Sequence, residues 1–216
     1  MNVIFDMDGV IFDSERAYID LYKKLAPKYG LDDVEAVHRA CMDSIGVTRK
    51  KTKEIFFSYV GFEFDYDRYR EDVQEELNKR EFELKPGVYA LFEWLRAQRI
   101  PVALGSSTRR VSVSRMLDSA GLKPYFDAIV CGDMVSHSKP HPEIFLTAAE
   151  KLGAVPADCY VIEDSYNGVR AAHAAGMHPI MVPDILQPDD EIRELAEVVL
   201  PSLIEVRDYL EEKNEA

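Results

Sequence analysis

The stretch Val3-Ile4-Phe5-Asp6-Met7-Asp8-Gly9-Val10 decides the fold predicted for this chain of 216 residues. Its first three residues are apolar with no polar face, which is typical of a strand buried on both sides of a sheet. Two aspartates follow where that strand ends, and Gly9 allows the backbone to turn sharply. Residues two apart in extended chain point the same way, so we expect Asp6 and Asp8 to face one ligand. Asp-x-Asp-Gly also forms ordinary solvated turns, so the rest of the chain has to decide between the two interpretations.

The composition is that of an ordinary globular protein, with 47% apolar and 30% charged residues. A formal net charge of -13 argues against nucleic acid or an anionic membrane as a partner, because both need a basic surface. The three cysteines, Cys41, Cys131 and Cys159, are widely spaced, which suits a reducing compartment and offers no zinc site. The first residues run directly into a strand without a targeting segment, so we expect a cytoplasmic protein.

Residues 14–81 have helical periodicity throughout. Apolar residues mark one face from Tyr18 to Leu25, with Gly30 as a stop, and further helices are expected over 33–42, 48–59 and 65–84. Lys85-Pro86-Gly87 then breaks the pattern. We therefore expect four helices in 14–81 to form a unit of their own, and 1–13 with 82–216 to form a second one.

From Gly87 onward, helices alternate with short apolar strands. The strands are expected near residues 100–104, 128–130, 160–162, 179–182 and 198–200, with a helix before or after each of them. This alternation is typical of a parallel sheet covered on both faces. We expect an α/β fold with a Rossmann-like parallel sheet, and an inserted domain of four helices over the edge where Asp6 and Asp8 lie.

Each expected strand end carries polar side chains, and parallel strands bring these ends together at one edge of the sheet. Four gathered acids repel one another unless a cation joins them or they take up protons. Oxygen ligands without a thiolate favour Mg²⁺, which also takes phosphate oxygens from a substrate. Lys139 and Ser106 could bind the remaining phosphate oxygens, helped by N–H groups near Thr108 at a helix start. The strand ends carry, in order, Asp6 and Asp8, Ser106 and Ser107, Lys139, and Glu163 and Asp164.

These motifs resemble those of the haloacid dehalogenase superfamily, in the branch of β-phosphoglucomutase and small sugar-phosphate phosphatases. The resemblance covers the whole chain, because all four family motifs occur in order and the helical insert is similar to the family's cap. The matching segments are Asp6-Met7-Asp8-Gly9-Val10, the hydroxyl after Val102-Ala103-Leu104-Gly105, Lys139-Pro140, and Glu163-Asp164-Ser165 followed by Asn167-Gly168.

The resemblance implies a role for each matching residue. Asp6 becomes an aspartyl phosphate, and Asp8 protonates the leaving oxygen and then activates water. Mg²⁺ is held by Asp6, the main-chain carbonyl of Asp8 and Asp164, with Glu163 as a neighbouring ligand or an orienting residue. Gly9, Ser106, Ser107 and Lys139 hold the phosphate. The expected partner is a small phosphorylated substrate, and a monomer is favoured.

Four functions are compared on the residues of this chain. Hydrolysis is favoured over a mutase reaction, because mutases typically have histidine where this chain has Tyr18, and usually threonine where it has Phe12. Glu15, in Asp13-Ser14-Glu15, resembles the phosphatase branch. Dehalogenation is disfavoured, because those enzymes generally lack the second aspartate, here Asp8. A binding module without turnover is the alternative of a different class, and the intact acids weigh against it.

Substrate choice is expected to lie in the helical insert. A basic cluster spans Arg49 to Lys53, and Thr48 is expected to cap the helix that carries it. Cations at a helix start interact unfavourably with the helix dipole, so the placement of this basic cluster needs a reason. One hypothesis is that Arg49 or Lys50 grips the far end of the substrate, and a solvated basic face is the alternative. Glu15, and Arg16 beside it, are further candidates for substrate contact.

Overall fold

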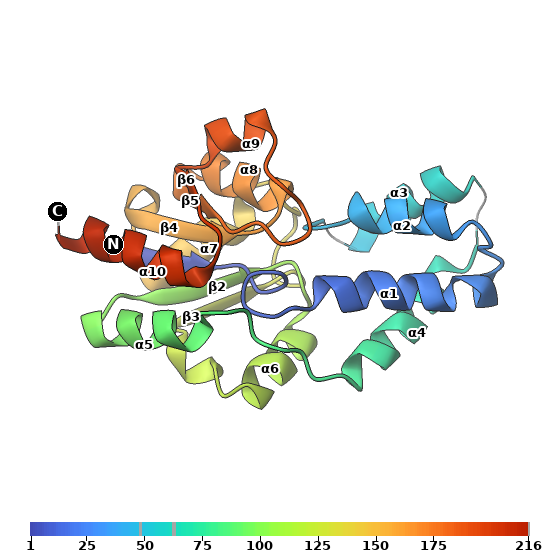
Figure 1. Ribbon diagram of the computed structural model, residues 1–216, viewed down its shortest axis with the longest axis horizontal. Helices are drawn as coiled ribbons and strands as arrows, with labels where there is room; N and C mark the ends of the chain where they lie inside the picture. The colour runs from blue at the N-terminus through green and yellow to red at the C-terminus, as the bar shows by residue number, and fades with distance from the viewer. Residues whose placement is uncertain (48, 62–63, 216) are drawn as a thin grey trace.

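The computed structural model describes residues 1–47, 49–61 and 64–215, and for Arg49 and Lys50 it describes the backbone alone. Six strands form one parallel sheet in the order β3-β2-β1-β4-β5-β6 (Figure 1). The predicted α/β class and Rossmann-like sheet are therefore confirmed. The strands are β1 (Asn2–Phe5), β2 (Val102–Ser106), β3 (Ala128–Cys131), β4 (Cys159–Glu163), β5 (His178–Met181) and β6 (Val198–Val199).

Strand β1 lies in the middle of the sheet, between β2 and β4. Val3 is in register with Val102 on one side and with Tyr160 on the other. The chain order reverses direction at this strand, so a crevice opens at its carboxyl end, which is where such sheets bind ligands. Asp6 is the first residue beyond that end.

Helices cover both faces of the sheet, as alternation along β1 requires. Val3 and Phe5 pack on one face, and Ile4 packs on the other. The first face is covered by α5 (Val88–Gln98), α6 (Arg110–Ser119) and α10 (Leu203–Glu215), and the second by α7 (Glu143–Leu152) and α8 (Tyr166–Ala174), with α9 (Asp190–Leu195) beside α8.

Four further helices project beyond the carboxyl edge of the sheet, away from the two chain termini (Figure 1). They have an aromatic core of their own, in which the rings of Tyr22, Phe56 and Tyr69 are in contact. Asp33 and Asp65 cap two of them by accepting a backbone N–H. We call these four helices the cap: α1 (Glu15–Leu25), α2 (Val34–Met42), α3 (Arg49–Val60) and α4 (Tyr66–Asn78).

The predicted helix over 65–84 is wrong at its end, because α4 stops at Asn78. The following segment instead runs back along the loop after β1. Asp13 donates its N–H to the Glu83 carbonyl at 2.9 Å, and Lys85 donates to Ile11 at 2.9 Å. Backbone pairing with a distant segment thus overrides the local helical pattern. The predicted cap residue Thr48 lies outside the described residues.

The remaining two observations concern possible membrane spans and the cysteines. Along the described ranges, each helix is too short or too polar to cross a bilayer. Cys41, Cys131 and Cys159 are all buried free thiols.

Candidate active site

Three buried carboxylates meet where β1 and β4 end. Asp6 follows β1, while Glu163 ends β4 and Asp164 follows it. Each of them offers one oxygen atom that lies within 4.8 Å of those of the other two. The Asp6 N–H donates to the Ile162 carbonyl at 2.9 Å, which extends the pairing of the strands to the acids themselves. The sheet thus brings together the acids that the sequence placed at two separate strand ends.

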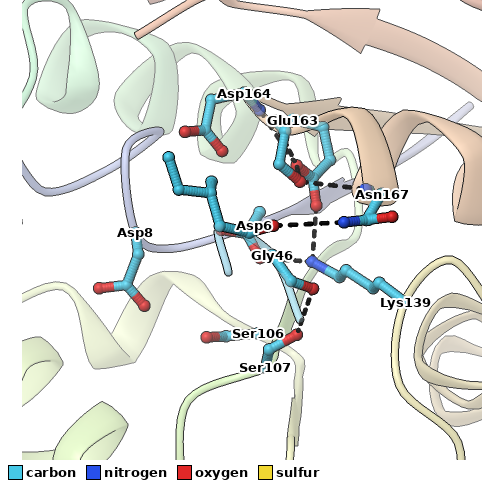
Figure 2. A network of polar contacts seen from close by, with 12 residues as sticks. Asp6, Asp8, Gly46, Ser106, Ser107, Lys139, Glu163, Asp164 and Asn167 are labelled. Atoms are coloured by element: carbon cyan, nitrogen blue, oxygen red, sulfur yellow. Dashed lines mark hydrogen bonds and ion pairs between the residues drawn. The ribbon is translucent and has the colours of Figure 1, made fainter. Parts of the chain in front are cut away.

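Lys139, in the loop after β3, is the cation that contacts these carboxylates. Its Nζ donates to Oδ1 of Asp6 at 2.5 Å and to Oε1 of Glu163 at 2.6 Å (Figure 2). The whole residue is 3% exposed. Burial alone would lower the pKa of Lys139, but the two carboxylates raise it above its usual range. Lys139 is therefore charged and fixed beside Asp6.

Glu163 uses its second oxygen within its own turn. Oε2 accepts hydrogen bonds from the N–H groups of Asp164 and Ser165 and from the Ser165 hydroxyl. The Ser165 hydroxyl in turn caps α8 by accepting the Gly168 N–H. With both oxygens engaged, Glu163 orients Lys139 and the Asp164 turn, which favours the orienting role over that of a metal ligand.

The site holds more negative charge than Lys139 balances. Burial, opposed by Lys139, and repulsion from Glu163 and Asp8 raise the pKa of Asp6 to about 7. Burial and repulsion from Glu163 and Glu15 also raise the pKa of Asp164. Buried oxygen donors that repel one another in this way fit a divalent cation such as Mg²⁺. The candidate metal ligands are thus Asp6 and Asp164.

Asp8 lies in the loop after β1, and its carboxylate stands apart from the three buried acids (Figure 2). The Ser14 hydroxyl donates to Oδ1 at 2.6 Å, and the Thr108 hydroxyl donates to Oδ2 at 2.7 Å. The simple alternation of an extended strand does not continue to Asp8, since β1 ends at Phe5. Gly9 makes the turn with φ +78°, and a Cβ there would lie 2.1 Å from the Asp164 carboxylate.

The two serines after β2 lie on the other side of Asp6 from Glu163 (Figure 2). Ser107 lines the cavity in front of the acids. Ser106 is 1% exposed and accepts the Thr108 N–H, so it shapes the turn that presents Thr108 to Asp8. Of the two predicted phosphate-binding serines, Ser107 is thus the one that faces the cavity directly.

A family model described as haloacid dehalogenase-like hydrolase matches residues 3–182. The chain belongs to this family. It is 35% identical over 214 residues to a phosphorylated carbohydrates phosphatase of Thermotoga maritima, covering 97% of this chain and 98% of the relative. It is 31% identical to hexitol phosphatase B of Escherichia coli, covering 94% and 92%.

The structures of family members agree with this assignment. A β-phosphoglucomutase from Clostridium difficile superposes with a TM-score of 0.82 at 25% identity, covering 99% of this chain and 97% of that one. The family and the enzyme class predicted from the sequence, a phosphoric monoester hydrolase, are therefore confirmed.

The acids of this haloacid dehalogenase-type site face a cavity of about 480 Å³ between the sheet edge and the cap. Asp6, Asp8 and Asp164 line it from the sheet side. Glu15 lines it from the start of α1, and burial together with repulsion from Asp8 raises its pKa to about 8. The predicted contact of Glu15 with substrate stays a prediction. The side chain of Arg49, the other predicted contact in the cap, lies outside the described residues.

Sequence reasoning missed several residues of this cavity. The hydroxyls of Ser14 and Thr108 hold Asp8, and both were expected only at helix starts. Arg70 on α4 and Arg115 on α6 also line the cavity, although neither belongs to a family motif. A local signal was present, because each of these arginines lies on a helical face that also carries apolar residues.

Proposed function

We propose that this protein is a Mg²⁺-dependent phosphatase that hydrolyses a small phosphorylated metabolite, with a sugar phosphate favoured, through a phosphate ester of Asp6. The observation that carries the proposal is the buried Asp6 carboxylate, fixed by Lys139 beside Asp164 at the sheet edge that faces the cavity. The cavity's volume suits a substrate of this size.

Asp6 and Asp164 would hold the metal, with the main-chain carbonyl of Asp8, and Glu163 would orient their turn. When bound, the ion offsets the negative charge of phosphate and carboxylates, without which an anionic nucleophile is repelled by its target. Lys139, Ser106, Ser107 and the backbone at Gly9 would bind the phosphate oxygens.

Asp6 and Asp8 divide the reaction between them. A carboxylate oxygen of Asp6 attacks phosphorus while the bond from phosphorus to the leaving oxygen breaks, and Asp8 gives that oxygen its proton. Asp8 then takes a proton from water, whose oxygen attacks phosphorus while the bond from phosphorus to the Asp6 oxygen breaks. This step releases inorganic phosphate and restores the Asp6 carboxylate. The hydrogen bonds from Ser14 and Thr108 keep the Asp8 carboxylate in the orientation that both proton transfers need.

The named relatives support a carbohydrate phosphate as the substrate class, since those quoted above are a phosphatase of phosphorylated carbohydrates and a hexitol phosphatase. Three free thiols fit our expectation of a cytoplasmic enzyme. The histidine typical of mutases is replaced here by Tyr18, whose hydroxyl hydrogen-bonds with the Tyr22 hydroxyl at 3.1 Å.

The test is phosphate release from p-nitrophenyl phosphate and from a panel of phosphorylated sugars, with and without Mg²⁺. We expect release that requires the metal and that Asp6→Asn abolishes. Asp158→Asn is the matched control, because it makes the same change at an exposed position at the opposite edge of the sheet. Release that survives Asp6→Asn, or no release from any compound, would overturn the proposal. Isomerisation that depends on a bisphosphate and gives no net phosphate would identify a mutase.

A further inference from the structure

Arg70 is a cation of the cap that faces the active-site cavity. It lies on α4 with Gln74 and Leu77, and these three residues, spaced by four and three positions, form the stripe of that helix that lines the cavity. The side chain is half-buried, and its Nε is buried without a hydrogen-bond partner among the residues that the structure describes. A buried donor left in this state is costly, so it indicates a missing partner.

Among the residues that the structure describes, no acid forms an ion pair with Arg70. Its neighbours are the hydroxyls of Tyr18, Tyr22 and Tyr66, and that of Tyr18 is also a hydrogen-bond partner. Arginine stays protonated when buried, and a buried cation needs an anion or several acceptors to offset its loss of water. Two other basic residues of the cap have such partners, Lys53 in Asp67 at 2.8 Å and Arg68 in Asp72 at 2.9 Å. Arg70 has the position and the unused donor of a ligand-binding residue.

The group that Arg70 would bind is not the phosphate that is transferred. Asp6 already has its own cation in Lys139, whose Nζ donates to Asp6 and to Glu163. Arg70 lines the cavity from α4 in the cap, whereas Asp6 and Asp164 line it from the sheet side. The position of Arg70 therefore suits a second polar group of the same substrate, at the end away from the reacting phosphorus.

A second arginine lines the cavity from the sheet side. Arg115 lies on α6 with Ser112 and Met116, which also line the cavity. One of its guanidinium nitrogens donates to the Arg80 carbonyl at 3.3 Å, and its Nε is buried with no partner in the described part of the chain. Two guanidinium groups at one cavity, one from the cap and one from the core, thus each have a buried Nε without a partner among the described residues.

We propose that Arg70, assisted by Arg115, selects substrates that carry a second anionic group, a carboxylate or a second phosphate, at the end opposite the phosphate that is removed. This inference rests on the proposed function and narrows its substrate class. A guanidinium pairs with such groups through two parallel hydrogen bonds, which is why arginine is the suited residue. Placing one arginine on the cap would also make binding of the correct substrate hold the cap against the core.

The test compares glucose 6-phosphate with 6-phosphogluconate and with glucose 1,6-bisphosphate, which differ from it by a carboxylate or by a second phosphate. We expect kcat/KM for at least one of the two compounds with a second anionic group to exceed that for glucose 6-phosphate. Arg70→Gln should lower that value about 10- to 100-fold, mainly through KM, while the value for glucose 6-phosphate changes less, so the preference disappears. Arg115→Gln should reduce the preference in the same direction.

Arg68→Gln is the matched control, because Arg68 lies two residues away on α4, is exposed, does not line the cavity and pairs with Asp72 at 2.9 Å. Arg70→Lys keeps a positive charge and should restore part of the preference, which a folding defect would not do. Where none of the three sugars is turned over but p-nitrophenyl phosphate is, the same compounds are compared as competitive inhibitors.

A wild-type enzyme that shows no preference for either compound with a second anionic group, or an Arg70→Gln variant that keeps the preference, would overturn this inference and leave the phosphatase proposal intact. A wild-type enzyme that releases phosphate neither from p-nitrophenyl phosphate nor from any of the sugars would instead overturn the phosphatase proposal itself.

Discussion

The carboxylate of Asp8 is held by one hydroxyl on each oxygen, and this arrangement sets its expected role. Thr108→Val removes one of the two hydrogen bonds, while the side chain keeps its shape and the Thr108 N–H still reaches Ser106. Since Asp8 has to move a proton in both steps, we expect kcat to fall about 10-fold with little change in KM. Steady-state kinetics on the best sugar phosphate measures this. Thr147→Val on α7 is the control, and equal activity in Thr108→Val and wild type would show that this hydrogen bond is dispensable.

The free energy of unfolding is expected to depend on pH through Glu15, and the surroundings of Glu15 set the direction of that dependence. Burial and repulsion from Asp8 raise its pKa from 4.5 to about 8, so the folded state binds the proton more tightly than the unfolded state. The stabilising contribution is therefore present below about pH 4.5 and is lost as pH rises toward 8. Metal-free Glu15→Gln should be more stable than wild type by ~2 kcal/mol at pH 8, with little difference at pH 4.5.

Urea unfolding in EDTA at both pH values measures this difference. Glu150→Gln, at an exposed position on α7, should follow the wild type at both. A gap between Glu15→Gln and wild type that is as large at pH 4.5 as at pH 8 would show that Glu15 acts through packing.

At the level of elements, the sequence was sufficient where local pattern and tertiary structure agree. The strands have short apolar runs bounded by polar or glycine residues, and Ser165 and Asp33 cap the helices that they precede. Pattern failed after Asn78, because the segment before Lys85 pairs with the loop beyond β1, and no local property of that segment reveals a partner 70 residues away.

The two connections between cap and core meet at one buried acid that the sequence did not single out. Oδ1 of Asp184, in the loop after β5, accepts from Arg16 at 2.6 Å and from Lys85 at 2.9 Å. Arg16 lies just after the first connection and Lys85 lies on the second. The Asp184 side chain is 3% exposed, whereas that of Asp13, which also pairs with Arg16, is 41% exposed.

We therefore expect Asp184→Asn to lower the free energy of unfolding by about 1–3 kcal/mol, because it weakens two ion pairs at a buried position. Asp13→Asn should cost at most about 0.5 kcal/mol, as exposed ion pairs do. Urea unfolding of the two variants against wild type gives both values. Equal losses would mean that the burial of Asp184 adds nothing to these pairs.

Taken as a whole molecule, the protein shows which part of its site the sequence determines. The acids and Lys139 follow strand ends, and a parallel sheet brings strand ends together whatever the helices between them do. The cap's contribution depends on which face of α4 is turned toward the sheet. Arg70, which lines the cavity, differs from Arg68 in sharing a helical face with Val73 and Leu77, but that pattern does not reveal that the face lies over the active site. The sequence therefore predicted which acids and which lysine lie together at the sheet edge, but not the arginines that line the cavity.

The loop at Ile45 and Gly46 joins the cap to the core through two hydrogen bonds. Their carbonyls accept from Asn167 at 3.3 Å and from Ser107 at 3.5 Å, so this loop of the cap rests on the core beside the acids (Figure 2). Gly46 has φ +75°, and a Cβ there would lie 2.6 Å from the Ser165 hydroxyl. Gly61, at the end of α3, also has φ +75°, but no atom of the described residues lies within 4 Å of such a Cβ.

Alanine at these two glycines separates backbone strain from cap closure. Both Gly46→Ala and Gly61→Ala should lose about 1 kcal/mol of stability, since alanine is strained at positive φ. Only Gly46→Ala should push the cap away from the core, and kcat/KM should then fall about 10-fold or more, because the cavity no longer closes around the substrate. Thermal unfolding and steady-state kinetics on the same samples give both quantities. If Gly61→Ala loses as much activity as Gly46→Ala, strain in the cap explains the loss, and contact at Ser165 does not control closure.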